Sequence, residues 1–435
     1  MCKFLKIRHQ KAPSSLAWDY IIMSRRHFRF VQDLDRVSLQ DLQERSNGYG
    51  VILADMSEQQ QMPMYSPYVF PELPKLIYTL PPANFANYQE NVQWSIERIS
   101  ECTASRTIGF QGGSVNARIL YEPLVKEVLL PEEQIDLRTK VNIERFHLDV
   151  CDIVAEKAKY EESTDVGTTV EGCSIVANRE ILALLASSIQ RQQTYIKVKC
   201  CFYKGRLFLK KGREPMPDYQ NGDKIPEADI NRPLVFECAM TCPQENEPNF
   251  LTAEAPWYQL YVQTMVTLNN KQIFVNGEVN CLDWNNKLEQ VDLKCRKGGL
   301  ASEPMWNFYS AEWFMRSKLV GTEKLLVGKY YDGIDKVEGV EAINISELET
   351  GSGHFRDGRC FSFQNPWKKS ALFKHLNDVL DTLYQVASSP EYYGKVVEVV
   401  KEAGEKGFFV TYVTDDLKAI FPDHFLTRFG RYNFD

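Results

Sequence analysis

Residues 274–295, FVNGEVNCLDWNNKLEQVDLKC, decide the class of fold that this sequence predicts. Apolar residues alternate with polar ones on both sides of a polar loop, so the stretch predicts two strands joined as a hairpin. Glu278 lies on the first predicted strand, and Asp292 and Lys294 form an Asp-x-Lys triplet on the second. Asn280 stands where a second carboxylate would make a better metal cage. The stretch therefore predicts charged side chains gathered on an antiparallel sheet.

The composition is that of a soluble globular protein. The chain has 435 residues, of which 44% are apolar and 25% are charged, which suits one large α+β domain or two ordinary ones. No run approaches the roughly 18 apolar residues of a membrane helix, so we expect no membrane partner. Eleven cysteines at irregular spacings argue against a disulfide framework. We therefore predict an intracellular protein with buried thiols.

The charge is unevenly distributed. A net charge of −7 argues against a protein that coats nucleic acid through bulk charge. Up to Phe30 there are seven Lys or Arg against one acid, Asp19, which is the composition of an arm that contacts phosphate or an import receptor. The same composition suits a poorly ordered tail without a role. The first residues also lack the apolar core of a secretory signal.

Further charged candidates lie upstream of the hairpin. A helix is predicted to begin at Asn178, which caps it, and Arg179 lies in its first turn. The alternating segment that follows predicts a hairpin with Lys197 and Lys199 on one face. Glu237 is the single charge in a short apolar run, where a carboxylate must be paired, protonated or bound to metal.

The C-terminal part predicts the remaining elements. Residues 306–319 predict a helix that carries aromatic residues and Arg316, and residues 325–345 predict two strands. A long amphipathic helix is predicted over residues 365–390, and residues 395–413 predict a final hairpin. Together these elements predict an α+β fold around a mixed, largely antiparallel sheet with flanking helices.

The predicted domain organisation is simple. Residues 1–83 show little periodicity and end in proline-rich sequence, so we interpret them as a partly irregular appendage. Residues 84–435 are then the single large domain that contains the sheet.

The acidic residues suggest metal-assisted hydrolysis of phosphodiesters or pyrophosphates. Mg²⁺ and Mn²⁺ prefer carboxylate oxygens, and such chemistry also needs a cation for the scissile phosphate. Glu237, Glu278 and Asp292 supply the three carboxylates, and Lys294 supplies the cation on the strand of Asp292. A solvent-exposed hairpin with alternating acids and lysines explains the same pattern. For Glu237 the alternative is a buried acid paired with a base.

Arg179 is a candidate for binding phosphate. The helix dipole disfavours a cation in the first turn, and this misfit is explained if the side chain helps to hold a phosphate at the helix N-terminus. A solvated first-turn residue is the alternative.

These segments resemble the DXO family of decapping exoribonucleases. The likeness is collinear from GGSVNARILYEP (residues 112–123), through IDLR (135–138), to the C-terminal hairpin. The resemblance implies a DXO-like fold related to metal-dependent nuclease cores, Mg²⁺ or Mn²⁺ as cofactor, and single-stranded RNA 5′ ends as substrate. It also implies the roles of the residues that fall on the family's motifs: Arg179, Phe236 and Glu237, Glu278 and Asn280, Asp292 and Lys294, and Arg316.

Three departures from the family pattern weaken the implied metal site. Asn280 replaces a metal-binding Asp, Asp292 replaces a longer Glu, and Arg316 replaces a neutral Gln that contacts substrate. Together they remove about two units of negative charge, which in a partly desolvated pocket disfavours two divalent cations. The cations Arg179, Lys197, Lys199, Lys294 and Arg316 remain available for RNA phosphates.

We therefore expect a nuclear, non-catalytic RNA 5′-end binding protein that shields transcripts within a complex, with Mg²⁺ or Mn²⁺ as cofactor only if the site is active. The resemblance extends to an insect germline branch of the family with a degenerate site, which protects piRNA precursors together with chromatin-bound partners. A 5′–3′ exonuclease is the other implied partner. The alternative is an active metal-dependent decapping nuclease or pyrophosphohydrolase that tolerates Asn280, and a third reading is a scaffold whose pocket binds nothing.

Overall fold

The computed structural model divides the chain into two compact units, Met1–Pro71 and Glu72–Asp435. In the first unit it describes the short antiparallel strands β1 (Leu5–Lys6) and β2 (Tyr20–Ile21). The predicted basic arm otherwise lies outside the described residues. The structure describes residues 5–6, 20–21, 74–81, 92–105, 109–114, 116–141, 143, 149–154, 172–191, 193–212, 227–253, 255–331, 333, 335–350, 354–356, 359–361 and 367–429.

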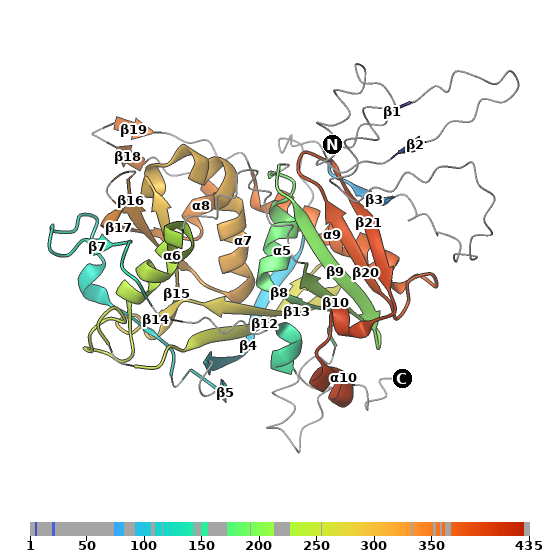
Figure 1. Ribbon diagram of the computed structural model, residues 1–435, viewed down its shortest axis with the longest axis horizontal. Helices are drawn as coiled ribbons and strands as arrows, with labels where there is room; N and C mark the ends of the chain where they lie inside the picture. The colour runs from blue at the N-terminus through green and yellow to red at the C-terminus, as the bar shows by residue number, and fades with distance from the viewer. Residues whose placement is uncertain are drawn as a thin grey trace, which may run out of the picture. The chain divides into compact units, whose positions relative to one another are not determined.

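The second unit contains a ten-stranded mixed sheet, in which β8 is parallel to both its neighbours and the other pairs are antiparallel (Figure 1). Its edge strand β3 (Lys75–Thr79) lies before residue 84, within the predicted appendage. This strand belongs to the sheet because it pairs with β21 (Gly407–Thr414). The order of the strands is β3 (Lys75–Thr79), β21 (Gly407–Thr414), β20 (Val396–Lys401), β9 (Ile196–Tyr203), β10 (Arg206–Lys211), β8 (Ile175–Asn178), β13 (Lys271–Val279), β12 (Gln259–Leu268), β4 (Trp94–Ser105) and β5 (Gly109–Gly112).

A second mixed sheet has seven strands, with parallel pairs at β6–β14 and β15–β16. The order of its strands is β11 (Thr241–Cys242), β6 (Ile119–Leu120), β14 (Cys281–Asp283), β15 (Glu289–Lys297), β16 (Lys324–Tyr330), β17 (Lys336–Asn344) and β7 (Ile135–Asp136). A small separate hairpin consists of β18 (His354–Arg356) and β19 (Arg359–Phe361).

Helices pack between and around the two sheets, and Figure 1 shows α5 and α7 side by side between them. The largest core cluster joins Val198 and Val275 of the ten-stranded sheet to Leu325 and Val327 of the seven-stranded sheet through these helices and α9. The helices are α5 (Arg179–Ser187), α6 (Glu227–Ala239), α7 (Ser310–Val320), α8 (Glu347–Thr350), α9 (Lys369–Ser388) and α10 (Asp423–Phe429), with a π-helix η6 (Met305–Tyr309) and 3-10 turns η4 (Glu122–Leu124), η5 (Gly299–Ala301) and η7 (Leu417–Ala419).

The predicted α+β class is confirmed, and so are several elements. The β9–β10 hairpin turns at Lys204 and Gly205, whose φ angles are both positive, as a two-residue turn of this twist requires. α5 begins directly after Asn178, although the Asn178 side chain makes no capping hydrogen bond. α9 begins at Lys369, later than predicted, and residues 365–366 lie outside the described part.

The prediction that residues 274–295 form one hairpin is wrong in one respect: its two main strands do not pair with each other. Its first strand, β13, pairs with β12 on one side and β8 on the other, so neither side of β13 is left for β15. The chain instead passes into the seven-stranded sheet at Asn280, and the three-residue strand β14 pairs with β15. Glu278 and Asp292 therefore belong to different sheets.

The described cysteines agree with the prediction of buried thiols. The nine cysteines among the described residues are free thiols, eight of them buried. Within the described ranges, no helix combines the length and apolar character needed to span a membrane.

Candidate functional site

The site forms where β13 gives way to β14. Asn280 occupies the junction, and its Oδ1 accepts a hydrogen bond of 2.8 Å from the backbone N–H of Leu293 on β15. This bond ties the end of the ten-stranded sheet to the strand that carries Asp292 and Lys294. The oxygen of Asn280 that could have served a metal is thus engaged in holding the two sheets together.

Arg118 is the centre of the site, and it is not among the residues predicted from the sequence. It lies immediately before β6 and is only 1% exposed. Its Nη1 donates to Glu237 Oε2 at 3.4 Å, and its Nη2 lies 3.5 Å from Glu278 Oε1. The guanidinium carbon lies 3.9 Å from the centre of the Trp257 ring. One arginine therefore bridges two of the three predicted metal ligands while it stacks on an aromatic ring.

A second arginine neutralises the third carboxylate. Arg179 Nη1 donates to Asp292 Oδ1 at 3.4 Å, and Ser317 Oγ donates to Asp292 Oδ2 at 2.8 Å. Arg179 Nε also donates to Glu180 Oε1 at 3.2 Å. The close approach requires Gly277, because a Cβ there would lie 2.4 Å from the Cδ of Arg179. The structure therefore places Arg179 in the interior, beside the acids, rather than in solvent.

Burial and neighbouring charges together set the pKa values of the ionisable groups in this site. Burial raises the pKa of Asp292, but the attraction of Arg179 and Lys294 outweighs it, so the pKa lies below its ordinary value. Burial lowers the pKa of Arg179, and the attraction of Asp292, Glu180 and Glu278 more than reverses this, so the guanidinium stays charged. Burial and the nearby arginines lower the pKa of Lys294 below its ordinary value.

Lys294 and Arg316 complete the cationic side of the site. Lys294 is half-buried, and its Nζ donates to the carbonyl of Leu293 at 3.2 Å. Arg316, on α7, pairs with Glu312 one turn earlier at 2.9 Å. The Nε of Arg316 is buried and has no hydrogen-bond partner among the described residues. These two side chains therefore keep donors that a bound anion can use.

The other predicted cations do not reach the site. β10 and β8 separate β9, which carries Lys197 and Lys199, from β13. Lys197 Nζ lies 2.7 Å from Glu398 Oε1, and Lys199 Nζ donates to the carbonyl of Ala419 at 3.4 Å. Both face away from the core that α5 and α9 share with Val198.

The arrangement does not fit a divalent metal. Within the described part of the chain, no three acidic, histidine or cysteine side chains converge on a point that could hold an ion. Five carboxylates and five cations of the chain form one connected network: Glu180, Glu237, Glu278, Asp292 and Glu312 with Arg118, Arg179, Arg191, Lys294 and Arg316. Each of these carboxylates already has an arginine nitrogen within 3.5 Å, so a divalent ion could bind only by displacing a cation of the chain.

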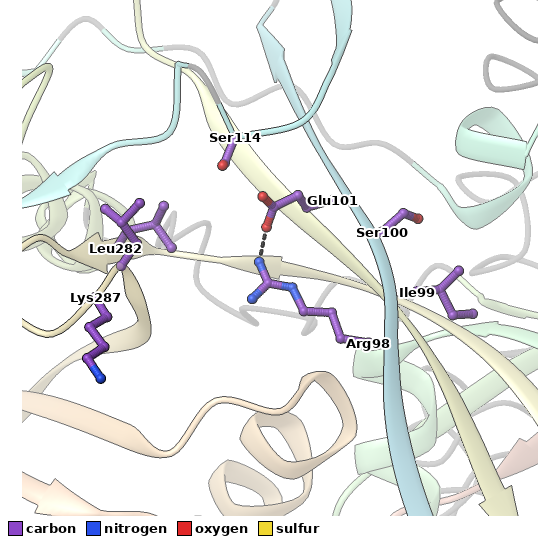
Figure 2. Close-up of a pocket in the computed structure, with 8 residues that line it drawn as sticks. Arg98, Ile99, Ser100, Glu101, Ser114, Leu282 and Lys287 are labelled. Carbon is purple, nitrogen blue, oxygen red and sulfur yellow. Dashed lines mark hydrogen bonds and ion pairs between the residues drawn. The ribbon is translucent and has the colours of Figure 1, made fainter.

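A surface cavity of about 420 Å³ lies elsewhere (Figure 2), and the predicted site residues do not line it. Arg98 and Glu101, both on β4, form an ion pair at its wall, and Lys287 lies across from them. The cavity is therefore separate from the site that contains Glu237, Glu278 and Asp292.

Known structures share this fold. Candida albicans Rai1 in complex with pU5 and Mn²⁺ is 14% identical, with a TM-score of 0.58 over 81% of this chain and 99% of that one. Scheffersomyces stipitis Rai1 with (3′-NADP)⁺ and calcium is 14% identical, with a TM-score of 0.59 over 79% and 99%. K. lactis Dxo1 in complex with manganese is 11% identical, with a TM-score of 0.53 over 79% of this chain and 98% of that one.

The sequence itself identifies the family. No curated protein matches it, but the family described as RAI1-like PD-(D/E)XK nucleases matches residues 115–426. This range includes Arg118, Arg179, Glu237 and the whole β13–β15 segment. Since the match spans well over half of the chain and agrees with the resemblance to the DXO family, the protein belongs to the RAI1-like PD-(D/E)XK nuclease family.

Proposed function

We propose that this protein binds the 5′ ends of single-stranded RNA without cutting them. The observation that carries the proposal is the pairing of Glu237 and Glu278 with Arg118, and of Asp292 with Arg179. Metal-assisted hydrolysis needs carboxylates that are free to bind the ion. Here Arg118 and Arg179, rather than a metal ion, balance the charges of these carboxylates.

The same cations suit a terminal phosphate. Arginine and lysine side chains bind phosphate oxygens through charge-assisted hydrogen bonds, which are stronger than neutral ones. Lys294 is half-buried and bonds only one carbonyl in the described structure, and Arg316 keeps a buried donor. A 5′ phosphate that enters here meets donors that are already held in position, so it does not need a metal to bridge it.

The relatives support RNA as the ligand class. The C. albicans Rai1 structure is a complex with pU5 and Mn²⁺. In this chain the position of a family carboxylate is taken by Asn280, whose oxygen is bonded to Leu293. We therefore propose that this chain recognises the RNA end but does not bind the metal.

In the cell, a bound and uncut 5′ end is shielded from decapping, degradation or termination. We place the protein in the nucleus, in a complex with chromatin-associated germline factors or a 5′–3′ exonuclease, as a paralogue of the Cutoff type that protects piRNA precursors. The support is the degenerate metal site at Asn280, Asp292 and Arg316 within a family of RNA 5′-end nucleases.

One assay tests the proposal. Purified protein is mixed with 5′-monophosphate, 5′-triphosphate or capped RNA, with Mg²⁺ or Mn²⁺, and both binding and product are measured. Binding without product is the expected result, and Arg316→Gln should weaken that binding by roughly ten- to a hundred-fold, since a hydrogen bond to a charged group contributes about 1.5–3 kcal/mol. A product that disappears with EDTA and with Glu278→Ala would instead show an active metal-dependent decapping nuclease.

A further inference from the structure

The cationic side of the site continues along β15 toward the surface. Asp292, Lys294 and Arg296 alternate with Val291 and Leu293, so they share the other face of the strand. Asp292 is fully buried, whereas Lys294 and Arg296 are half-buried. At about 3.3 Å per residue, Arg296 lies roughly 6.6 Å beyond Lys294 along the strand. Two cations thus lead outward from the proposed phosphate site.

Arg296 is held against an aromatic ring. Its guanidinium carbon lies 3.8 Å from the centre of the Tyr309 ring, and that of Arg191 lies 5.1 Å from the same centre. The Nε of Arg296 is buried and has no hydrogen-bond partner among the described residues. The Tyr309 ring therefore holds two arginine side chains near one another.

The same network links this ring to the site. Arg191 pairs with Glu312, which also pairs with Arg316 at 2.9 Å. Tyr309 and Phe308 precede Glu312 by three and four positions, the spacings that bring side chains together on a helix. They belong to η6, and π-helical turns are frequent at functional sites. Phe308 is 52% exposed.

An exposed aromatic residue next in sequence to a tyrosine that contacts two arginines is a combination suited to single-stranded nucleic acid. Base stacking on an aromatic side chain supplies affinity without base selectivity, and arginines follow the backbone phosphates. The alternative is an exposed Phe308 that binds no ligand. That alternative does not explain why the residue lies on a π-helical turn that ion pairs connect to the site. The positive charge of Arg296 also disfavours a cationic partner.

We propose that Phe308 stacks on a nucleobase of single-stranded RNA downstream of the bound 5′ end, while Arg296 and Arg191 contact the following phosphates. This inference rests on the proposed function, because the 5′ phosphate at Lys294 and Arg316 sets where the strand begins. The surface then selects RNA ends with an unpaired run of nucleotides over mononucleotides.

The test compares two probes by fluorescence anisotropy or calorimetry: 5′-phosphorylated U5 and uridine 5′-monophosphate. Phe308→Ala should weaken binding of the pentamer on the order of ten-fold and leave the mononucleotide unchanged, and Phe308→Trp should restore the pentamer. Tyr412→Ala is the matched control, because Tyr412 is an aromatic residue of similar exposure, 58%, on β21.

The outcomes separate the two proposals. Equal binding of the pentamer by Phe308→Ala and wild type overturns the stacking surface alone. An equal loss for both probes also overturns it, since the effect would not lie downstream of the first nucleotide. If the wild type binds neither probe, the proposed function fails as well.

Discussion

Arg118 and Arg98 form the same kind of ion pair in two very different places. Arg118 is 1% exposed and bridges Glu237 and Glu278, whereas the Arg98 side chain is 46% exposed and pairs with Glu101 three residues along the same strand. The exposed pair gives up hydration and side-chain freedom for an attraction that water screens, so it adds little free energy. The buried group cannot lose a member without leaving charge uncompensated. Burial, rather than pairing as such, makes the first arginine indispensable.

The largest expected effect is the removal of the buried bridge. Arg118→Met keeps an apolar stem over Trp257 but leaves Glu237 and Glu278 without their cation. We expect the free energy of unfolding to fall by about 3–5 kcal/mol, as for other broken buried ion pairs. Urea unfolding monitored by tryptophan fluorescence measures this loss. If this loss were no greater than the loss from breaking the exposed Arg98–Glu101 pair, burial would not explain a difference between the two arginines.

Metal binding sharpens the comparison. In the double variant Arg118→Met, Asn280→Asp the carboxylates lose their internal cation and gain a ligand, so a divalent ion should stabilise the protein. At a hundred-fold excess over its dissociation constant, Mn²⁺ should add about 2.7 kcal/mol. Thermal unfolding with and without Mn²⁺ measures the shift. An equal Mn²⁺ shift in the wild type would contradict the idea that Arg118 replaces the ion.

His375 is a buried titratable group of a third kind, whose two ring nitrogens face neutral hydroxyls. Its Nδ1 lies 3.1 Å from Tyr78 OH and its Nε2 lies 2.8 Å from Ser188 Oγ. Burial lowers the pKa of His375 to about 3 from an ordinary 6.5. The folded protein therefore resists a proton that the unfolded chain accepts below 6.5.

Stability should consequently fall as the pH drops from 6.5 toward 3, by about 1.4 kcal/mol for each pH unit from this residue. His375→Gln keeps a polar contact but cannot titrate, so its stability should depend less on pH by that amount. Urea unfolding of both proteins at about pH 5.5 and pH 7.5 provides the comparison. Parallel pH profiles would show that His375 does not cause the slope.

The smallest effect is expected at the exposed pair. Arg98→Met repeats the substitution made at Arg118, and it should change the free energy of unfolding by about 0–1 kcal/mol, less at high salt. The same urea experiment measures it. A loss of several kcal/mol would place Arg98 in a network that its exposure does not indicate.

Local patterns account for much of the fold. The alternation around Lys204 and Gly205 predicted the β9–β10 hairpin, and the apolar stripe after Asn178 predicted α5, because each depends on residues close in sequence. The partner of β13 could not be read in this way. Strand pairing depends on which edges other strands have already taken, and β12 and β8 occupy both sides of β13.

The site shows the same division. Glu237, Glu278, Asp292 and Lys294 were candidates from the sequence, because charged residues in apolar or alternating runs need partners. Arg118 gave a weaker signal, a single arginine between Ala117 and Ile119, and its partners lie 119 and 160 residues away. No periodicity encodes contacts at such separations.

The sequence by itself determined that the chain carries acids and cations of a nuclease family in the family's order, with Asn280 and Arg316 as departures. Only the tertiary structure decided what those charges do. By joining two sheets at Asn280 it buries Arg118 between two carboxylates, and in a poorly solvated interior each charge must find its opposite within the chain.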